Sequence, residues 1–387
     1  MRASRMFNQR IMNINLRQAV TAALFVVLSF WLLTSAIGCA GDETTSSAAE
    51  NTTQETTRET TKATTTVATT TAQPTPTEPP PQITSRLTGL LMDAEDVDRR
   101  PIAVMINNIR KATPQIGIAA ADIMFEMEVE GGITRMLAVF QNTDAIPELG
   151  SIRSARHNYV DLAGGLDAIL VHVGGSYAAN DQMARQKTEH IDLGLYSAAY
   201  WRDEEWRTQR GMEHSVKTTG ERLQVVLDEK TSWRTDVRDS VGPLFNFREP
   251  EAFEPSDGSG ATRVTVPYSR YITAVFNYDA DRKVYTKNQF GSAQIDLATN
   301  EAIAFTNVFV LQTTIVSYDG GVLRQIDLSK GDGFYVSGGQ MQPIRWQKGD
   351  TDDPLAVTTA DGQPLPVNAG KSFISIVSKN QTIRFDP

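Results

Sequence analysis

The sequence has 387 residues, 40% of them hydrophobic, and a formal net charge of −9 at neutral pH. This length and composition are sufficient for folded domains with ordinary apolar cores. The negative balance argues against a general nucleic-acid-binding protein, because no surplus of basic residues is available to neutralise phosphates.

The amino terminus has the pattern of a lipoprotein export signal. Four arginines precede an apolar run from Ala19 to Gly38, and Cys39, the sole cysteine of the chain, follows it. The run is also about long enough to span a membrane as an uncleaved helix. The small or apolar residues directly before Cys39 favour cleavage and lipidation instead. Residues 1–38 are therefore predicted to be a signal peptide, and the mature chain is expected outside the cytoplasm, anchored to the cell membrane by acyl chains on Cys39.

Residues 39–83 are predicted to be the lipidated cysteine followed by a disordered tether. Residues 41–82 are rich in Thr and Pro and almost lack large apolar side chains. Such a segment cannot bury enough surface to offset its ordering entropy, and this composition is typical of stalks. Because the lipid uses the only cysteine, the stability of the rest of the chain must come from a core without disulfides.

Residues 84–250 are predicted to form an α/β domain with a mixed sheet. The run from Ile102 to Ile106 indicates a buried strand that ends on Asn107-Asn108. The alternating segments 122–130 and 133–141, joined by Gly131-Gly132, predict a β-hairpin. Ser154 is expected to cap a helix that runs to Leu162. Further along the chain we expect a buried strand over 167–173 and helices over 177–187 and 218–229.

Residues 262–387 are predicted to form a mainly β (α+β) domain, after a linker at 253–261. Short runs of β-branched and aromatic residues alternate here with Asp/Gly turns, which is typical of strands. The clearest runs are 273–278, 283–286, 304–317, 333–337 and 372–377.

The predicted hairpin gathers carboxylates on one face. Asp122, Glu126 and Glu128 share a face because strand side chains alternate. With a two-residue turn, Glu128 would oppose Arg135, and Met136 would lie on the apolar face. Like charges so close repel one another unless cations or a divalent metal ion lie among them.

Two arginines at the start of the next predicted helix suggest an anion site. Arg153 and Arg156, beside free N–H groups, could hold a phosphate or carboxylate. Alternatively, they neutralise Glu126 and Glu128 in a structural ion network. Other strand ends are expected to line the same crevice, because ligands bind beyond the carboxyl ends of strands in such sheets. The ligand-binding candidates are Arg135, Arg153, Arg156, Asn107, Asn108, Gly174, Gly175 and Ser176.

None of the four histidines has zinc-motif spacing to another. His172 lies inside a predicted buried strand, which indicates a core residue with satisfied hydrogen bonds. His214 lies in a polar loop before a helix and is the better functional candidate. Because the known nucleophile, zinc and phosphate-loop motifs are missing, catalysis would depend on Asp122, Glu126, Glu128 and His214.

Several segments are similar to the family of YerB-like lipoproteins. They include RPIAVMINN (100–108), GIAAADIMFEMEVEGGITRMLAVF (117–140), GSIRSARHNYVDLA (150–163), DAILVHVGGS (167–176) and GDGFYVSGGQMQPIRWQKG (331–349). This resemblance implies one unit with an amino-terminal α/β part and a carboxy-terminal part, without an established activity. The family's usual Pro-His-Asn triplet is replaced by Glu213-His214-Ser215, which weakens any role for residue 215.

Two functions from different classes follow. The first is an envelope module that binds a glycan, an anionic polymer or a protein partner. The second is a metal-assisted phosphoryl-transfer or hydrolytic enzyme acting on an envelope phosphate, such as a polyprenyl phosphate or pyrophosphate, with Asp122 and Glu126 as metal ligands or base and Arg153 with Arg156 as clamp. An acidic strand before an arginine-bearing segment is also similar in order to the LytR-CpsA-Psr phosphotransferases.

Overall fold

A computed structural model describes residues 82–387. The predicted signal peptide, Cys39 and the tether up to residue 81 lie outside the described residues. Gln82 and Ile83 were assigned to the tether, but they belong to strand β1 (Gln82–Thr84), which pairs antiparallel with β2 (Leu91–Asp93). Within residues 82–387, no helix has both the length and the apolar character needed to cross a membrane.

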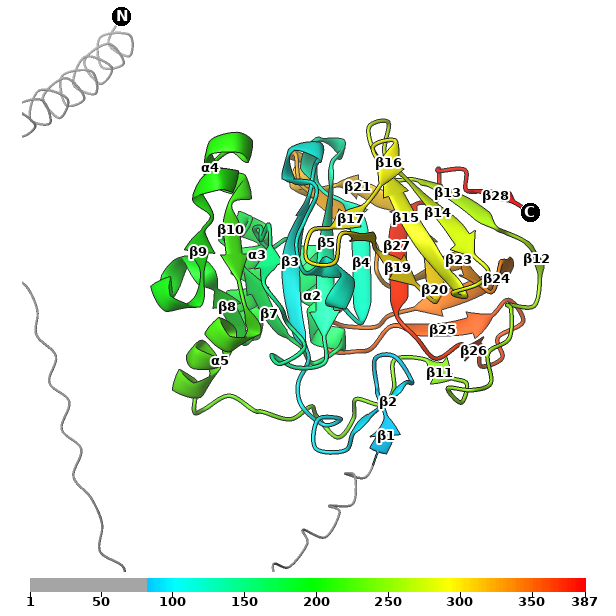
Figure 1. The fold of residues 1–387 in the computed structure, drawn as a ribbon, viewed down its shortest axis with the longest axis horizontal. Coiled ribbons are helices and arrows are strands. Elements are labelled where there is room, and N and C mark those ends of the chain that lie inside the picture. Colours follow the sequence, from blue (N-terminus) through cyan, green and yellow to red (C-terminus); the bar gives the residue numbers. More distant parts are fainter. Residues whose placement is uncertain (1–81) are drawn as a thin grey trace, which may run out of the picture. The chain divides into compact units, whose positions relative to one another are not determined.

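One eleven-stranded sheet runs through both halves of the described sequence (Figure 1). Its central seam is the parallel pairing of β4 with β27, in which Met124 lies opposite Phe373. The strands follow the order β12-β24-β23-β20-β27-β4-β5-β3-β7-β8, and β25 pairs with β24. Their bounds are β12 (Ser259–Gly260), β24 (Gln340–Gln347), β23 (Lys330–Ser337), β20 (Asn307–Thr313), β27 (Ser372–Ser378), β4 (Ile123–Glu128), β5 (Thr134–Phe140), β3 (Ile102–Asn108), β7 (Ile169–His172), β8 (His190–Asp192) and β25 (Ala356–Thr359).

The central strands are buried on both faces, and their sequences explain why. All residues of β3 and β5 are buried, and strands covered on both sides have nearly continuous apolar runs. Their side chains divide between two cores, one on each face of the sheet. Val104 and Phe140 belong to one core, and Met105 and Phe125 belong to the other.

Helices cover both faces of the amino-terminal part of the sheet. Helices α2 (His157–Gly165) and α3 (Tyr177–Gln186) pack into the core of Met105 and Phe125. Helix α5 (Gly220–Glu229) packs on the opposite face. Side-chain oxygens cap α3, α4 (Glu204–Arg210) and α5; they come from Ser176, Asp203 and Thr219, respectively. Such caps satisfy N–H groups that have no partner within the helix.

A second sheet packs on the carboxy-terminal part of the first. Its order is β16-β15-β14-β13-β28, with β19 beside β15, and the ring of Phe276 lies 5.0 Å from that of Phe373. These strands are β16 (Ser292–Ala293), β15 (Val284–Gln289), β14 (Thr273–Asp279), β13 (Arg263–Pro267), β28 (Arg384–Asp386) and β19 (Ala304–Phe305). Small sheets contain β6 (Leu149–Gly150), β9 (Trp201–Arg202) and β10 (Val216–Thr218); β11 (Asn246–Phe247) and β26 (Pro366–Val367); β17 (Ile295–Asp296) and β18 (Glu301–Ala302); and β21 (Ile315–Ser317) and β22 (Arg324–Ile326).

The predicted fold class is confirmed. The amino-terminal part has a mixed sheet with few helices, and the carboxy-terminal part consists mainly of antiparallel strands. The predicted run over 304–317 is not one strand but three, β19, β20 and β21, which pair with different partners. The boundaries 84–250 and 262–387 stay a prediction, although the shared sheet joins the two halves through backbone hydrogen bonds.

The hairpin exists, but its predicted register is wrong by one residue. Glu128 lies opposite Thr134, and Arg135 lies opposite Met127. The turn contains three residues, because Glu130 joins the two glycines and the N–H of Val129 donates to the carbonyl of Ile133 at 2.8 Å. A one-residue shift exchanges the faces of a strand. Met136 therefore lies on the carboxylate face, and Arg135 lies on the other.

One predicted element end also differs. Ser154 does not cap a helix: α2 begins at His157, Arg156 is its N-cap residue, and no side chain caps it. The backbone of residues 151–155 instead forms hydrogen bonds with neighbouring strands. Strand β3 ends on Asn107 and Asn108 as predicted, and these residues lie opposite Arg135 and Thr134.

Candidate functional site

The segment from Ser151 to Ala155 lies between two strands of the large sheet. Strands β3 and β7 pair in parallel only from Ile102 to Val104. Beyond that point the N–H of Arg153 donates to the carbonyl of Met105 at 2.9 Å, and its carbonyl accepts from Val173 at 3.1 Å. Arg153 therefore occupies the carboxyl ends of two parallel strands, where α/β sheets usually bind ligands.

The inserted segment also brings other predicted residues together. The N–H of Asn107 donates to the carbonyl of Ser151 at 2.9 Å, on the β3 side. On the β7 side, Ala155 donates to Gly174 at 3.0 Å and accepts from Ser176 at 3.1 Å. Asn107 and the loop 174–176 thus flank the same segment.

His214 joins this group through Asn107. The ring Nδ1 of His214 lies 2.8 Å from Nδ2 of Asn107, and the imidazole is buried. Because an amide nitrogen only donates, Nδ1 accepts and the ring proton lies on Nε2, which is 3.3 Å from the Glu213 carboxylate. Burial lowers the pKa of His214, so the ring is neutral at pH 7.

Three arginines lie close to one another beside this segment, and two of them pair with the same carboxylate. Arg156 holds Glu130 with two guanidinium nitrogens, one of them Nε at 2.8 Å from Oε2. Arg135 lies 3.7 Å from the same carboxylate and donates to the carbonyl of Ser154. Arg153 donates to the backbone carbonyl of Glu213 at 2.9 Å. Its buried Nε has no hydrogen-bond partner among residues 82–387. We call Arg135, Arg153 and Arg156 the arginine cluster.

The cluster carries more positive charge than its nearest carboxylates neutralise. Burial, and then the charge of Arg156, lower the pKa of Arg135 to about 9. Burial alone would raise the pKa of Glu130, but the hydrogen bonds and charge of Arg156 lower it to about 2. Arg135 and Arg156 therefore share the Glu130 carboxylate, and exposed Glu213 is the acid that acts most strongly on Arg153. An anion bound here would reduce the mutual repulsion of the arginines.

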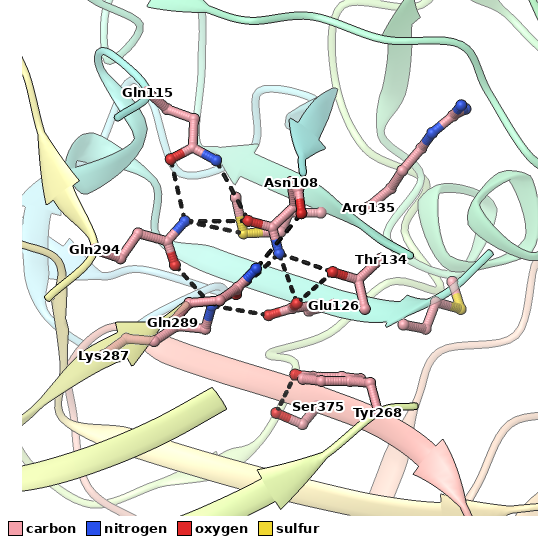
Figure 2. A network of polar contacts seen from close by, with 12 residues as sticks. Asn108, Gln115, Glu126, Thr134, Arg135, Tyr268, Lys287, Gln289, Gln294 and Ser375 are labelled. Carbon is pink, nitrogen blue, oxygen red and sulfur yellow. Dashed lines mark hydrogen bonds and ion pairs between the residues drawn. The ribbon is translucent and has the colours of Figure 1, made fainter. Parts of the chain in front are cut away.

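The predicted catalytic carboxylates do not converge, because each has its own partner. Glu126 is completely buried and lies 3.1 Å from the ammonium group of Lys287, which is equally buried. It also accepts from Thr134 at 2.7 Å and from Asn108 at 2.6 Å. Figure 2 shows this network, which we call the buried network, with Arg135 pointing away from it. Asn108 thus belongs to the buried network rather than to the group of Asn107 and His214.

The remaining carboxylates lie apart from the buried network. Asp122 accepts from the N–H of Gln141 at 2.9 Å, and burial raises its pKa to about 6 despite the nearby charge of Lys371. Glu128 pairs with Arg324 at 2.9 Å. Between residues 82 and 387, no three His, Cys, Asp or Glu side chains are placed to hold a metal ion together.

His172 is the satisfied core residue that its position predicted. Its Nδ1 lies 2.8 Å from the carbonyl of Gly174, and its Nε2 lies 2.9 Å from Nδ1 of His190. The ring therefore holds the backbone of the loop 174–176 at Gly174.

Sequence reasoning missed the partners that come from distant segments. Lys287 and Gln289 of β15 enter the buried network from the carboxy-terminal half. The alternation of β15, in which Tyr285, Lys287 and Gln289 share one face, was the available signal. The Glu130–Arg156 pair had no such signal, because it depends on the three-residue turn.

Comparison with known proteins supplies the family. The N-terminal domain of the family described as "Protein of unknown function (DUF3048)" matches residues 87–233, and its C-terminal domain matches residues 264–374. The chain belongs to the DUF3048 family.

Relatives agree with this family in sequence and in structure. The chain is 32% identical over 302 residues to "Putative lipoprotein YerB" of Bacillus subtilis (strain 168), covering 76% of this chain and 86% of that protein. The crystal structure of YerB from Bacillus subtilis matches with a TM-score of 0.69 and 28% identity, over 79% of this chain and all of that one. The predicted resemblance to YerB-like lipoproteins is confirmed. Because the DUF3048 description names no activity, the function must be inferred from the site.

Proposed function

We propose that this DUF3048 protein is a lipoprotein anchored through Cys39 outside the cytoplasm, whose folded part binds an anionic ligand of the cell envelope. The name of the Bacillus subtilis relative supports the lipoprotein part. So do the apolar run and the position of Cys39. The ligand class is a phosphate-bearing or carboxylate-bearing envelope molecule.

The arginine cluster is the observation that carries the binding proposal. Its positive charge is concentrated on a chain whose net charge is −9. The guanidinium groups of Arg156 and Arg135 interact mainly with Glu130 and backbone carbonyls. Arg153, in contrast, makes one side-chain hydrogen bond within residues 82–387. Arg153 is therefore the guanidinium that can grip a ligand, and Asn107 and Ser176 lie on either side of it.

The variants Arg153→Gln and Arg156→Gln should distinguish a role in ligand binding from a role in stability. We expect Arg153→Gln to weaken binding of inorganic pyrophosphate at least about tenfold in isothermal titration, the equivalent of 1.4 kcal/mol. Its thermal stability should stay close to that of the parent. Arg156→Gln should instead cost about 1.5–3 kcal/mol of stability, because Glu130 loses charge-assisted hydrogen bonds. Arg185→Gln, on an exposed ion pair, is the control. Equal pyrophosphate binding by the parent and Arg153→Gln would refute the proposal.

The anchor is tested separately. Cys39→Ser should abolish incorporation of labelled palmitate and leave the signal peptide uncleaved. Normal processing and labelling of this variant would contradict the lipoprotein assignment without affecting the binding experiment.

A further inference from the structure

The large sheet forms an open groove at the carboxyl ends of β20 and β27. The groove has a volume of about 790 Å³, within the range of specific ligand sites. Its lining comes from β20, β23, β24 and β25 and from residues that follow β20, β22, β25 and β27. We call it the sheet groove. It contains none of the residues of the arginine cluster.

The sheet groove arises because one sheet face changes from apolar to polar along the strands. Val310 of β20 lies opposite Phe334 of β23, and Val310 is buried in the core beneath the second sheet. Two residues further along the same face, β20 presents Gln312 and β23 presents Asp332. Arg345 lies opposite both Asp332 and Thr358 in neighbouring strands. A polar row thus crosses four strands where the second sheet no longer covers the first.

Three cations of the sheet groove are exposed and have no ion-pair partner. Lys330, Arg345 and Lys379 line the groove, and none of them pairs with a carboxylate of residues 82–387. Some exposed arginines elsewhere in the described residues do have such partners, as Arg185 has Asp181 and Arg207 has Glu204. The groove lining also contains two carboxylates, Asp327 and Asp332, so its three cations exceed its acids by one, beside the hydrogen-bonding groups of Gln and Thr side chains.

We propose that the sheet groove is a second binding site, which holds a strand of an anionic envelope polymer. Lys330, Arg345 and Lys379 pair with its phosphate or carboxylate groups, and the Gln and Thr side chains of the polar row bind its hydroxyl groups. A polymer fits better than a compact anion, because the cations come from separate elements along an open surface. Charge complementarity selects an acidic polymer over a neutral one.

The test compares the full chain, purified in detergent, with a triple variant Lys330→Gln/Arg345→Gln/Lys379→Gln. The matched control, Arg185→Gln/Arg207→Gln/Arg282→Gln, removes the same charge from exposed ion pairs. Fluorescence titrations use labelled poly(glycerol phosphate), oligogalacturonate and neutral dextran. We expect the parent and the control to bind one or both acidic polymers, and the triple variant to bind them about tenfold or more weakly. Preference between the two acidic polymers identifies phosphate or carboxylate as the recognised group.

The outcomes distinguish this site from the arginine cluster. Loss of polymer binding in Arg153→Gln with full binding in the triple variant would overturn the sheet groove and assign the polymer to the cluster. Failure of the parent to bind either acidic polymer, or equal binding of dextran, would also overturn it. Because the three side chains are exposed, melting temperatures near that of the parent are expected, and Arg345→Gln alone repeats the test if the triple variant is unstable.

Discussion

Glu126 and Lys287 form an ion pair that is wholly removed from water, at the meeting of the two halves of the sequence. Burial lowers the pKa of Lys287, while the carboxylate of Glu126 opposes that shift. Two charges without solvent are tolerated only when each finds further polar partners. Thr134 and Asn108 supply them for Glu126, and Gln294 accepts from Lys287 at 2.6 Å.

Removing one member of this pair should be costly. We expect Lys287→Met to destabilise the protein by about 3–5 kcal/mol, because Glu126 would remain charged or take up a proton in the interior. The double variant Lys287→Met/Glu126→Leu should recover much of the loss, since no buried charge remains. Thermal unfolding of both variants measures this, and Arg185→Met controls for loss of a cation. A double variant as unstable as the single one would mean that packing, not charge, sets the cost.

Asp122 should make stability depend on pH. Burial raises its pKa from 3.8 to about 6, so the folded protein holds this proton more tightly than the unfolded chain does. The stability from Asp122 is therefore complete below pH 4 and is lost as the pH rises to about 6. Asp122→Asn keeps an acceptor for Gln141 but cannot ionise. The melting temperature of the parent relative to this variant should fall between pH 4 and 6; a constant difference would contradict the prediction.

At the scale of elements, the sequence was sufficient to predict most strands and helices but not which strands pair or in which register. The continuous apolar run of β3, the glycine-joined hairpin and the Ser176 cap of α3 all have local signals. The register depends on whether Glu130 belongs to the strand or to the turn, and the structure places it in the turn, where it pairs with Arg156. The extended segment 151–155 was mistaken for the approach to a capped helix, because its partners, β3 and β7, are distant in sequence.

The hairpin turn gives a prediction at this scale. Gly131 has φ of 73°, and a Cβ atom there would meet no atom within 4 Å. The positive φ angle, and not the space around the residue, therefore limits which side chains position 131 tolerates. Gly131→Asn should be nearly neutral because Asn tolerates the left-handed region, whereas Gly131→Val should cost about 1–2 kcal/mol. Thermal unfolding compares the two. Equal stabilities would mean that the turn can adopt another conformation.

At the scale of the whole molecule, the two halves should depend on each other. Strand β4 pairs with β27, and the partner of buried Glu126 comes from β15. We expect fragments 82–255 and 256–387 to be unfolded or aggregated when expressed separately, and to regain the near-ultraviolet circular dichroism of the parent when refolded together. A folded, monomeric 82–255 fragment would support independent domains with the boundaries predicted from the sequence.

The pairing of Met124 with Phe373 also has a consequence during synthesis. Strand β4 is synthesised early and its partner β27 almost last, so the central sheet cannot form before the chain is nearly complete. A chain whose sheet closes late stays unfolded during synthesis, which is the state that the proposed export through a secretion channel would require. The same delay affects any chain that terminates before Ser372, because the edges of β4 and β20 would both stay unpaired and open to proteases.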